Sequence, residues 1–565
     1  AAVNKALSVL DIPLFEGSNS WVIAPEKTKN GKVIFANDPH IGFSQPSVWF
    51  EAHVETPTYS KYGYHIAGIP FPLLGHDRKL AYGLTMFEND DVDFYYEQNN
   101  PANENQYLSK NGHVDYEIIH KTIYVKDADD IQFSYKRSDH GPILNGIADQ
   151  IQGDRPIAMS WVYTEMENKV IDALYGLSHS NNLAEFKKSL PKIHAPGLNI
   201  MYGDNEGNVA WFATAQLYKI PDSVNTKLIY EVNKGLSLER ELIDFNENPQ
   251  AINPPNNFVY SANNQPDSIA GMLYPGYYLP ENRGKRIVNL LEPKDDWDIS
   301  AASEMITDVI SSVEPDIVSN LAKYLDVSLL SENGLKAIDS LKMWSGDYNL
   351  SSIEATVYNR WIYYLLENTF EDELDEELFN QFLSTHFMKR LIAPLSKDEN
   401  SVWWDNVNTT NVSENMKDIV NLSFMEAIAS LEKDFGNNVN QWRWERVHSI
   451  EHGHPIGQIA ALRSFFNVGP FPIHGSREVI NNLAFAYDDT GFYKTTSGPS
   501  TRRVIDFSDV ENSISILPTG QSGNPLSKHY RDQAEMYVNG EFRKMMMNKE
   551  EIKKSKEILT FKPKD

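Results

Sequence analysis

The chain has 565 residues, and none of them is cysteine. This absence excludes disulfide bonds, a thiol nucleophile and zinc sites built from cysteine. It does not locate the protein, because an oxidising compartment permits disulfides without requiring them. If the protein uses a side-chain nucleophile, we expect it to be a hydroxyl group.

Positive charge is also scarce in this chain. Lysine and arginine total 51 against 78 aspartates and glutamates, which leaves a net charge of −27. Nucleic-acid-binding proteins present a basic face to phosphates, and anionic membranes repel a chain this acidic. No apolar run approaches the roughly 18 residues that a membrane-spanning helix needs. We therefore expect no nucleic-acid partner and no membrane partner.

The chain does contain enough apolar sequence for a large core. Hydrophobic residues make up 41% of it and aromatic residues 12%, which is too rich for a disordered protein. A folded protein of this size buries roughly three quarters of the surface that its open chain exposes. Length alone is a soft prior for about four domains.

The spacing of apolar residues changes twice along the chain. Short alternating runs between turn residues predict strands over about 18–265, with a hairpin at 200–208. Helical spacing appears near 167–190 and dominates about 299–440. Strand texture returns after about 475. These changes predict a β-rich body that is interrupted by a helical excursion.

Seven short polar motifs punctuate the predicted strands. They are FEGSNSWVI at 15–23, ANDPHIG at 36–42, GLTMFENDDVD at 83–93, RSDHGPI at 137–143, ANNQP at 262–266, GPSTR at 498–502 and GQSGNP at 520–525. Each motif alone is typical of a turn or a cap. In this order they resemble the β subunit of the penicillin acylase family of N-terminal-nucleophile hydrolases, which includes penicillin, cephalosporin and acyl-homoserine-lactone acylases. The resemblance runs from Ser18 to about Tyr537.

The resemblance implies an α+β fold, the αββα sandwich of two packed antiparallel sheets flanked by helices. The β subunit would be 18–565, with its core at about 18–298 and 441–565 and a helical excursion at about 299–440. Residues 1–17 would be a spacer or an α-subunit tail that processing removes. The chain begins with alanine instead of methionine, so we expect a processed product. The family also implies an α subunit from the same precursor and a periplasmic or secreted bacterial protein.

Ser18 matches the nucleophile of the family. A serine hydroxyl is a poor nucleophile until a base takes its proton. Family members use the α-amine of the same serine, whose reference pKa of about 7.7–8.0 leaves a neutral fraction near neutral pH. Because that amine exists only after the preceding bond is cut, we predict autoproteolysis of an inactive precursor between Gly17 and Ser18. A glycine before the cut tolerates the strained backbone that self-cleavage needs.

The resemblance implies further residues around this serine. The side-chain amide of Asn263 and the backbone N–H of Met86 would stabilise the oxyanion, and one such donor is typically worth about 3–4 kcal/mol. His40 stands where cephalosporin-acylase-like members carry histidine, and we expect it to orient the Ser18 amine or hydroxyl. Arg283 matches a family arginine near the site. Considered alone, Asn263 is typical of a turn, His40 of a structural histidine and Arg283 of a surface salt bridge.

An acidic run at 90–93 is a candidate calcium site, because carboxylates and carbonyls are hard oxygen ligands. In the family, the positions of Asp90 and Asp93 and the carbonyl of Val92 bind calcium. One further family ligand belongs to the α subunit, and another is an aspartate where this chain has Tyr274-Pro275. A solvent-exposed acidic turn is the alternative. No organic cofactor is expected.

Four residues match or adjoin positions that line the acyl pocket in penicillin G acylases. They are Ile41, Phe87, Glu88 and Leu198. Glu88 and Ile41 both stand where those enzymes have aromatic residues, so a phenylacetyl group is less expected than an aliphatic or polar one. We predict hydrolysis of small-molecule N-acyl amides of the penicillin or cephalosporin antibiotic type, with acyl-homoserine-lactone hydrolysis as the alternative.

Two hypotheses fall outside this class. The chain could be an inactive relative that is kept for ligand binding. It could also be a zinc hydrolase built on His448, His452 and His454, although their spacing is not the His-Glu-x-x-His pattern.

Overall fold

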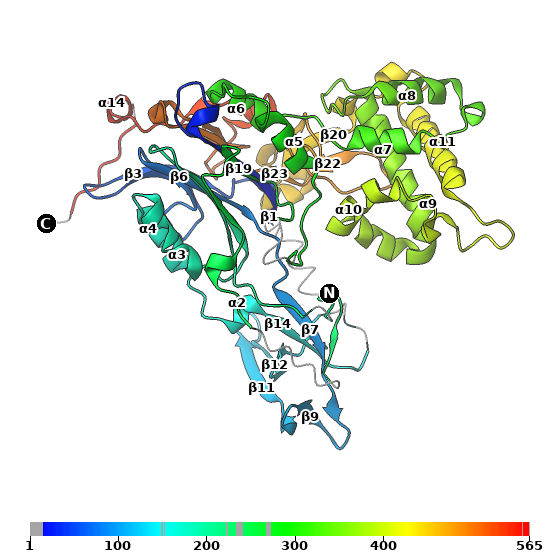
Figure 1. Cartoon of the computed structure of the whole chain (residues 1–565), viewed down its shortest axis with the longest axis horizontal. Coiled ribbons are helices and arrows are strands. Elements are labelled where there is room, and N and C mark those ends of the chain that lie inside the picture. The colour runs from blue at the N-terminus through cyan, green and yellow to red at the C-terminus, as the bar shows by residue number, and fades with distance from the viewer. Residues whose placement is uncertain are drawn as a thin grey trace.

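The computed structural model describes residues 15–148, 151, 153–221, 224–232, 241–266, 273–555 and 557–563. Two seven-stranded antiparallel sheets form the centre of this part of the chain (Figure 1). Among the described residues, no helix combines the length and the apolar composition needed to cross a membrane.

The first sheet carries the predicted nucleophile on an inner strand. Its order is β19 (Phe258–Ser261), β1 (Phe15–Ile23), β2 (Ile34–Gly42), β24 (Arg502–Asp506), β25 (Ile514–Ile516) and β26 (Arg543–Lys544), with β23 (Ser497–Pro499) pairing the end of β2. Residues 17–23 of β1 are all buried. A strand that is covered on both faces has no polar side, which explains the continuous burial.

The second sheet contains the predicted hairpin at 200–208. Its order is β18 (Gln250–Ile252), β16 (Val209–Thr214), β15 (Leu198–Asp204), β6 (Leu80–Met86), β5 (Leu74–His76), β4 (Ser60–His65) and β3 (Phe50–Glu55). The turn between β15 and β16 confirms the hairpin.

The two sheets pack face to face through small and branched apolar residues. Val22, Val33 and Phe35 of the first sheet share a buried cluster with Ala81 and Met201 of the second. At Gly203, an added Cβ would lie 2.8 Å from Val22 and 2.9 Å from Val33, so the close approach of the sheets requires a glycine there.

Helices cover the outer face of each sheet. The pair α3 (Val170–His179) and α4 (Leu183–Lys187), expected from the spacing at 167–190, packs with Tyr82, Leu84 and Tyr202 of the second sheet. On the other side, α5 (Asn282–Leu291) and α6 (Ile299–Ile306) pack with Trp21 and Ile34 of the first sheet. The order helix, sheet, sheet, helix confirms the predicted αββα sandwich.

The helical excursion shares its buried core with residues beyond 440, among them Trp442, Trp444 and Tyr487. Its helices are α7 (Glu314–Leu321), α8 (Glu332–Met343), α9 (Ile353–Leu383), α10 (His386–Leu395) and α11 (Met416–Phe435), which stand to one side of the sandwich in Figure 1. By contrast, α6 contacts β2 and β24, because Ala302, Met305 and Ile306 share a buried cluster with Ile34 of β2 and Val504 of β24. The segment 299–306 therefore belongs to the sandwich, and the excursion starts near 314.

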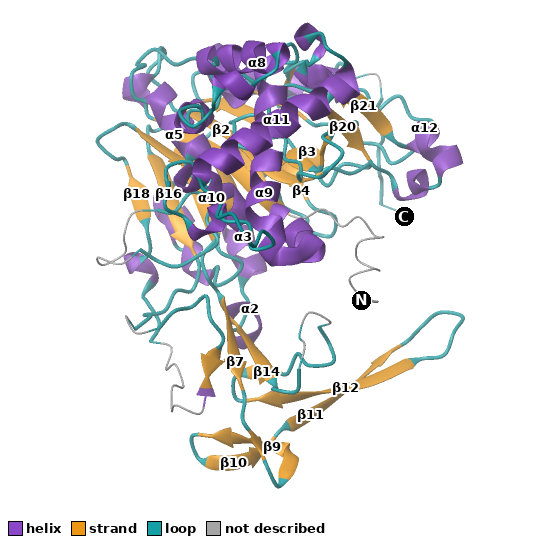
Figure 2. Ribbon diagram, turned by 90° about the vertical axis from the view of Figure 1, so that its right-hand side faces the viewer, coloured by secondary structure: helices purple, strands orange, loops and turns teal. Residues whose placement is uncertain are grey.

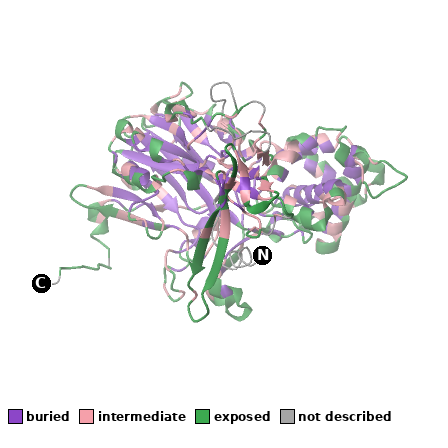
Figure 3. Cartoon of the chain, turned by 90° about the horizontal axis from the view of Figure 1, so that it is seen from below, coloured by how far each residue is buried: buried purple, intermediate pink, exposed green. Residues whose placement is uncertain are grey.

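A smaller β-rich extension lies below the sandwich in Figure 2. In it, β7 (Val92–Tyr96) pairs with β14 (Ile157–Trp161), and β8 (Asn99–Asn100), β9 (Asn103–Ser109) and β10 (Gly112–Asp115) form a three-stranded sheet. The hairpin of β11 (Glu117–Ile123) and β12 (Ile131–Ser138) belongs to the same extension. The sandwich is largely buried, whereas projecting strands are largely exposed (Figure 3).

Candidate active site

Ser18 lies in the middle of the buried strand β1, and the chain runs without a break through the Gly17–Ser18 peptide bond. Its hydroxyl donates a hydrogen bond to the carbonyl oxygen of Gly17, which is the carbonyl of that bond. Its N–H donates to Oδ1 of Asn263 at 2.6 Å. The nucleophile predicted from the sequence therefore lies beside the bond that it is predicted to cut.

Gly17 lies where there is little space for a side chain. It does not adopt the left-handed backbone conformation that glycine alone favours. An added Cβ would lie 3.2 Å from Cδ1 of Leu279 and 3.3 Å from Oδ1 of Asn263. The close approach of the Asn263 amide is thus a steric reason for a small residue at this position, beside the expectation from self-cleavage.

Asn263 follows β19 and has φ 63°, a left-handed conformation that asparagine tolerates better than most residues. Its Oδ1 accepts from Ser18 and, at 3.1 Å, from Arg283. Its Nδ2 donates to the carbonyl oxygen of Met86 at 2.9 Å. The structure thus brings Ser18, Asn263 and Met86 together, although in the uncut chain Asn263 contacts the carbonyl of Met86 and not its N–H.

Arg283 is completely buried at the start of α5 and joins several parts of the site. Its Nη1 donates to the carbonyl oxygen of Ser18 at 2.8 Å and to Oδ1 of Asn19 at 2.6 Å, and its Nη2 donates to Ala262 O at 2.8 Å. Burial lowers the pKa of the guanidinium, and the nearby carboxyl groups oppose this shift, Glu478 first. The alternative of a surface salt bridge is excluded by this burial.

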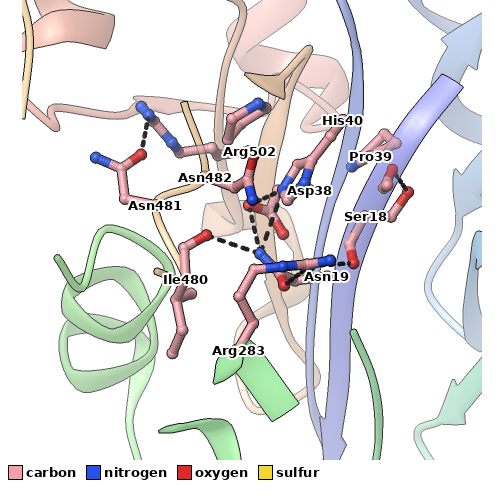
Figure 4. A network of polar contacts seen from close by, with 12 residues as sticks. Ser18, Asn19, Asp38, Pro39, His40, Arg283, Ile480, Asn481, Asn482 and Arg502 are labelled. Atoms are coloured by element: carbon pink, nitrogen blue, oxygen red, sulfur yellow. Dashed lines mark hydrogen bonds and ion pairs between the residues drawn. The ribbon is translucent and has the colours of Figure 1, made fainter. Parts of the chain in front are cut away.

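His40 contacts the neighbours of Ser18 instead of Ser18 itself. In the register of β1 with β2, Gly17 lies opposite His40 and Ser18 lies opposite Pro39. Successive side chains of a strand point to opposite faces, so His40 and the Ser18 hydroxyl lie on different faces. The ring Nε2 lies 3.3 Å from Asp38 Oδ2 and 3.3 Å from Asn19 Nδ2 (Figure 4). Any action of His40 on Ser18 in the uncut chain would have to pass through Asn19.

The buried pair of His40 and Asp38 is held in a low-dielectric environment. Burial, followed by the charges of Arg283 and Arg502, lowers the pKa of His40 well below its ordinary value. Burial raises the pKa of Asp38, although Arg502 and Asn19 oppose that shift. His40 is thus expected to be neutral at physiological pH. Asn19 Nδ2 also donates to Ile480 O at 2.8 Å, which anchors the pair to a distant segment.

Asn19, Asp38 and Asn199 belong to the site but were not predicted as site residues. Asn199 Nδ2 donates to Met86 O at 2.9 Å and to Ser261 Oγ at 3.1 Å. The first two residues stand inside the motifs at 15–23 and 36–42, so the motifs contained a signal for them. Asn199 adjoins the predicted pocket residue Leu198, but a single asparagine within an apolar strand carries no such signal.

The four predicted pocket residues do not share one environment. Ile41 and Leu198 belong to the buried cluster beneath α3 and α4, whereas Phe87 packs with Tyr278 in a separate cluster. A cavity of about 400 Å³ adjoins the Asn263 segment and is lined, among others, by Asn199, Ser261 and Asn264; none of the four lines this cavity. Burial raises the pKa of the half-buried Glu88 to about 7.

The acidic run has features that fit a cation. Asp90 and Asp93 are both buried, and Oδ1 of Asp90 has no hydrogen-bond partner among the described residues. Burial, with a contribution from Asp93, raises the pKa of Asp90 to about 6. Pro275 accepts the backbone N–H of Asp90 at 2.9 Å, so the Tyr274-Pro275 segment lies beside the run without supplying a carboxylate. The buried, unpartnered carboxyl oxygen excludes a simple exposed turn.

The described residues contain no group of three His, Asp or Glu side chains placed to hold a metal ion. His448 is buried against Trp444 and contacts Ile473 O, and burial lowers the pKa values of His448 and His452 to about 4. These histidines pack as core side chains, and a zinc centre on them has no support.

The sequence is similar to a family described as penicillin amidase, whose model matches residues 2–554. The acyl-homoserine lactone acylase QuiP of Pseudomonas aeruginosa is 25% identical over 95% of this chain and 67% of its own length. The penicillin acylase 2 proenzyme of a Pseudomonas species is 25% identical over 92% of this chain and 65% of its length. The chain thus spans about two thirds of the curated relatives that it matches.

A solved structure supports the same fold. The thermostable penicillin G acylase from Alcaligenes faecalis superposes with a TM-score of 0.72 at 19% sequence identity. The match covers 97% of this chain and 100% of the solved chain.

Proposed function

We propose that this chain, which belongs to the penicillin amidase family and hydrolyses amide bonds, uses Ser18 as an N-terminal nucleophile. The observation that carries the proposal is the placement of the Ser18 hydroxyl against the Gly17 carbonyl, with Asn263 holding the N–H of the same bond. The hydroxyl therefore lies next to the carbonyl group that it would have to attack in self-cleavage.

Maturation would proceed by an acyl shift from nitrogen to oxygen. The Ser18 Oγ attacks the Gly17 carbonyl carbon, and the hydroxyl proton passes to the Ser18 nitrogen as the C–N bond breaks. Water then hydrolyses the resulting ester. This leaves the Gly17 carboxyl group on one side and the free amine and hydroxyl of Ser18 on the other.

Turnover would use the amine that maturation exposes. The amine takes the Oγ proton, Oγ attacks the acyl carbonyl of the substrate, and the proton passes to the departing amine. The Asn263 amide and the Met86 N–H are the proposed oxyanion donors. Water releases the acid from the acyl-enzyme, and Arg283 keeps Asn263 and the Ser18 carbonyl in position throughout.

The mature N-terminus tests this proposal directly. We expect intact-mass measurement and N-terminal sequencing of active protein to find Ser18 as the first residue. Ser18→Ala should stay uncut and inactive, whereas Ser20→Ala, which alters a hydroxyl two residues away that bonds Ala36 O, should still be cut. Active protein that retains residues 1–17 would refute the mechanism and favour the inactive-relative or another catalytic hypothesis.

The acyl specificity is proposed from the match of Glu88 and Ile41 to family pocket positions, and not from a cavity that they line. Glu88 and Ile41 favour an aliphatic or polar acyl group over phenylacetyl, and we place penicillin- or cephalosporin-type amides first. Similarity to the QuiP acylases favours N-acyl-homoserine lactones as the second candidate. Release of the amine from phenylacetyl, glutaryl and long-chain amides, compared side by side, separates these classes.

Three further elements complete the proposal. A separate α chain would supply the remaining part of the enzyme, as the proenzyme relative and the two-thirds coverage suggest. Asp90, Asp93 and the Val92 carbonyl would hold a structural calcium ion. Residues 1–17 would be removed, and the enzyme would work in the periplasm or outside the cell.

A further inference from the structure

The β11–β12 hairpin is an amphipathic ribbon. Its register pairs Ile119 with Tyr135, Lys121 with Phe133 and Ile123 with Ile131. Directly opposed residues share a face, and so do residues two apart on one strand. One face, here called the apolar face, therefore carries Ile119, Ile123, Ile131, Phe133 and Tyr135, together with the charged side chains of Glu117, Lys121 and Arg137. The other face carries Ile118, His120, Thr122, Gln132, Ser134 and Lys136.

The apolar face is left uncovered. Ile123 is 50% exposed, Ile131 54% and Phe133 41%, and Figure 2 shows the two strands projecting from the rest of the chain. Within the described part of the chain, β11 pairs with β12 alone, and β12 meets a third strand only at Arg137 and Ser138. A two-stranded ribbon is marginally stable in water and needs another surface on its apolar side. Exposed apolar patches of this kind mark interaction sites.

The lengths of the relatives indicate what covers this face. The curated relatives are matched over 67% and 65% of their lengths, whereas the solved acylase chain is matched over all of its length. About a third of each relative therefore has no counterpart in this chain. A second copy of this chain is disfavoured, because each copy carries a net charge of −27.

We propose that the apolar face of the hairpin is a docking surface for the α chain, the product of that remaining third; this rests on the two-chain organisation proposed above. The turn of the hairpin carries Asp127, Asp129 and Asp130 against one lysine. The surface on the α chain should therefore be apolar at its centre and basic where it meets this turn. Phe133 and Ile131, two residues apart on β12 toward the turn, would contribute most of the binding energy.

Hydrogen exchange on the whole protein tests this surface. The samples are the product of the complete gene, which includes any sequence that precedes residue 1, and the 565-residue chain alone. Amides of 117–137 should exchange at least tenfold more slowly in the first sample. The double variant Ile131→Asn and Phe133→Asn should lose that protection and recover less α chain on purification. The matched double variant Gln132→Asn and Ser134→Asn alters the other face and should keep both.

Equal exchange of 117–137 in the two samples would overturn the proposal. So would protection that appears in the isolated chain only as its concentration rises, since that outcome assigns the face to a second copy. Neither readout requires catalysis. A protein that is uncut at Ser18 but protected at 117–137 would refute the proposed mechanism and leave the docking surface in place.

Discussion

At the scale of single residues, the site depends on one buried cation and one amide. Arg283 binds two backbone carbonyls and the side chains of Asn19 and Asn263, so a planar fork with several donors is needed at this position. Asn263 in turn uses both ends of its amide, the oxygen toward Ser18 and the nitrogen toward Met86. The position of Ser18, the proposed nucleophile, therefore depends on these two side chains.

Replacing Asn263 with alanine should lower kcat for amide hydrolysis by about 100- to 1,000-fold, because one oxyanion donor is lost. The matched control is Asn264→Ala, because the Asn264 side chain accepts a hydrogen bond from the N–H of Ala262 in the same turn. Stopped assays of amine release, with circular dichroism to check folding, provide the measurement. A folded Asn263→Ala protein with unchanged kcat would remove Asn263 from the oxyanion hole.

At the scale of elements, the helical excursion meets the sandwich through buried charge. Glu314 at the start of α7 is 5% exposed, and burial raises its pKa to about 7, with Glu478 adding to the shift and Tyr348 and Arg477 opposing it. The folded protein therefore keeps a proton that the unfolded chain releases between about pH 4.5 and 7. Stability falls as pH rises through this window.

Glu314→Gln should remove that loss. We expect the variant and the natural protein to unfold with similar free energies near pH 4.5, and the variant to be more stable by about 3 kcal/mol at pH 8. Urea denaturation at both pH values measures the difference. Glu332→Gln, at the exposed first turn of α8, should change neither value appreciably. An unchanged pH dependence in Glu314→Gln would show that Glu314 does not carry this effect.

At the scale of the whole molecule, the site is assembled by segments that are far apart in the chain. Ser18 bonds Asn263 across 245 positions, and Asn19 bonds Ile480 across 461. These distant segments must therefore be packed together before Ser18 is positioned. An ion that binds the folded state alone would stabilise this whole arrangement by mass action.

Calcium should raise the melting temperature of exhaustively dialysed protein. At a free concentration 100 times the dissociation constant, the stabilisation would be about 2.7 kcal/mol. Asp90→Asn should abolish the shift, and Asp91→Asn, in the same acidic run but outside the proposed ligand set, should retain it. Thermal unfolding with and without calcium, alongside metal analysis, provides the readout. An equal melting temperature with and without the ion would exclude the site.

Much of the secondary structure could be predicted from short segments of the sequence. The strand texture from about 18, the helical spacing near 167–190 and the hairpin at 200–208 are properties of short segments, and β1, the pair α3 and α4, and the pair β15 and β16 confirm them. The boundary expected at about 299 could not be judged in this way, because α6 has ordinary helical spacing and only the tertiary structure shows that it contacts β2 and β24.

By itself, the sequence determined the absence of thiol chemistry and the alternation of strands and helices, since both depend on residue identity and near neighbours, and its motifs led to the proposal of Ser18 as the hydroxyl nucleophile. Only the tertiary structure decided that His40 faces Asp38 and Asn19 instead of Ser18, that Arg283 is buried, and that the β11–β12 hairpin is left with an uncovered apolar face. The physical reason is that strand register, burial and exposure are set by whichever segments pack alongside, and those segments lie up to hundreds of residues away.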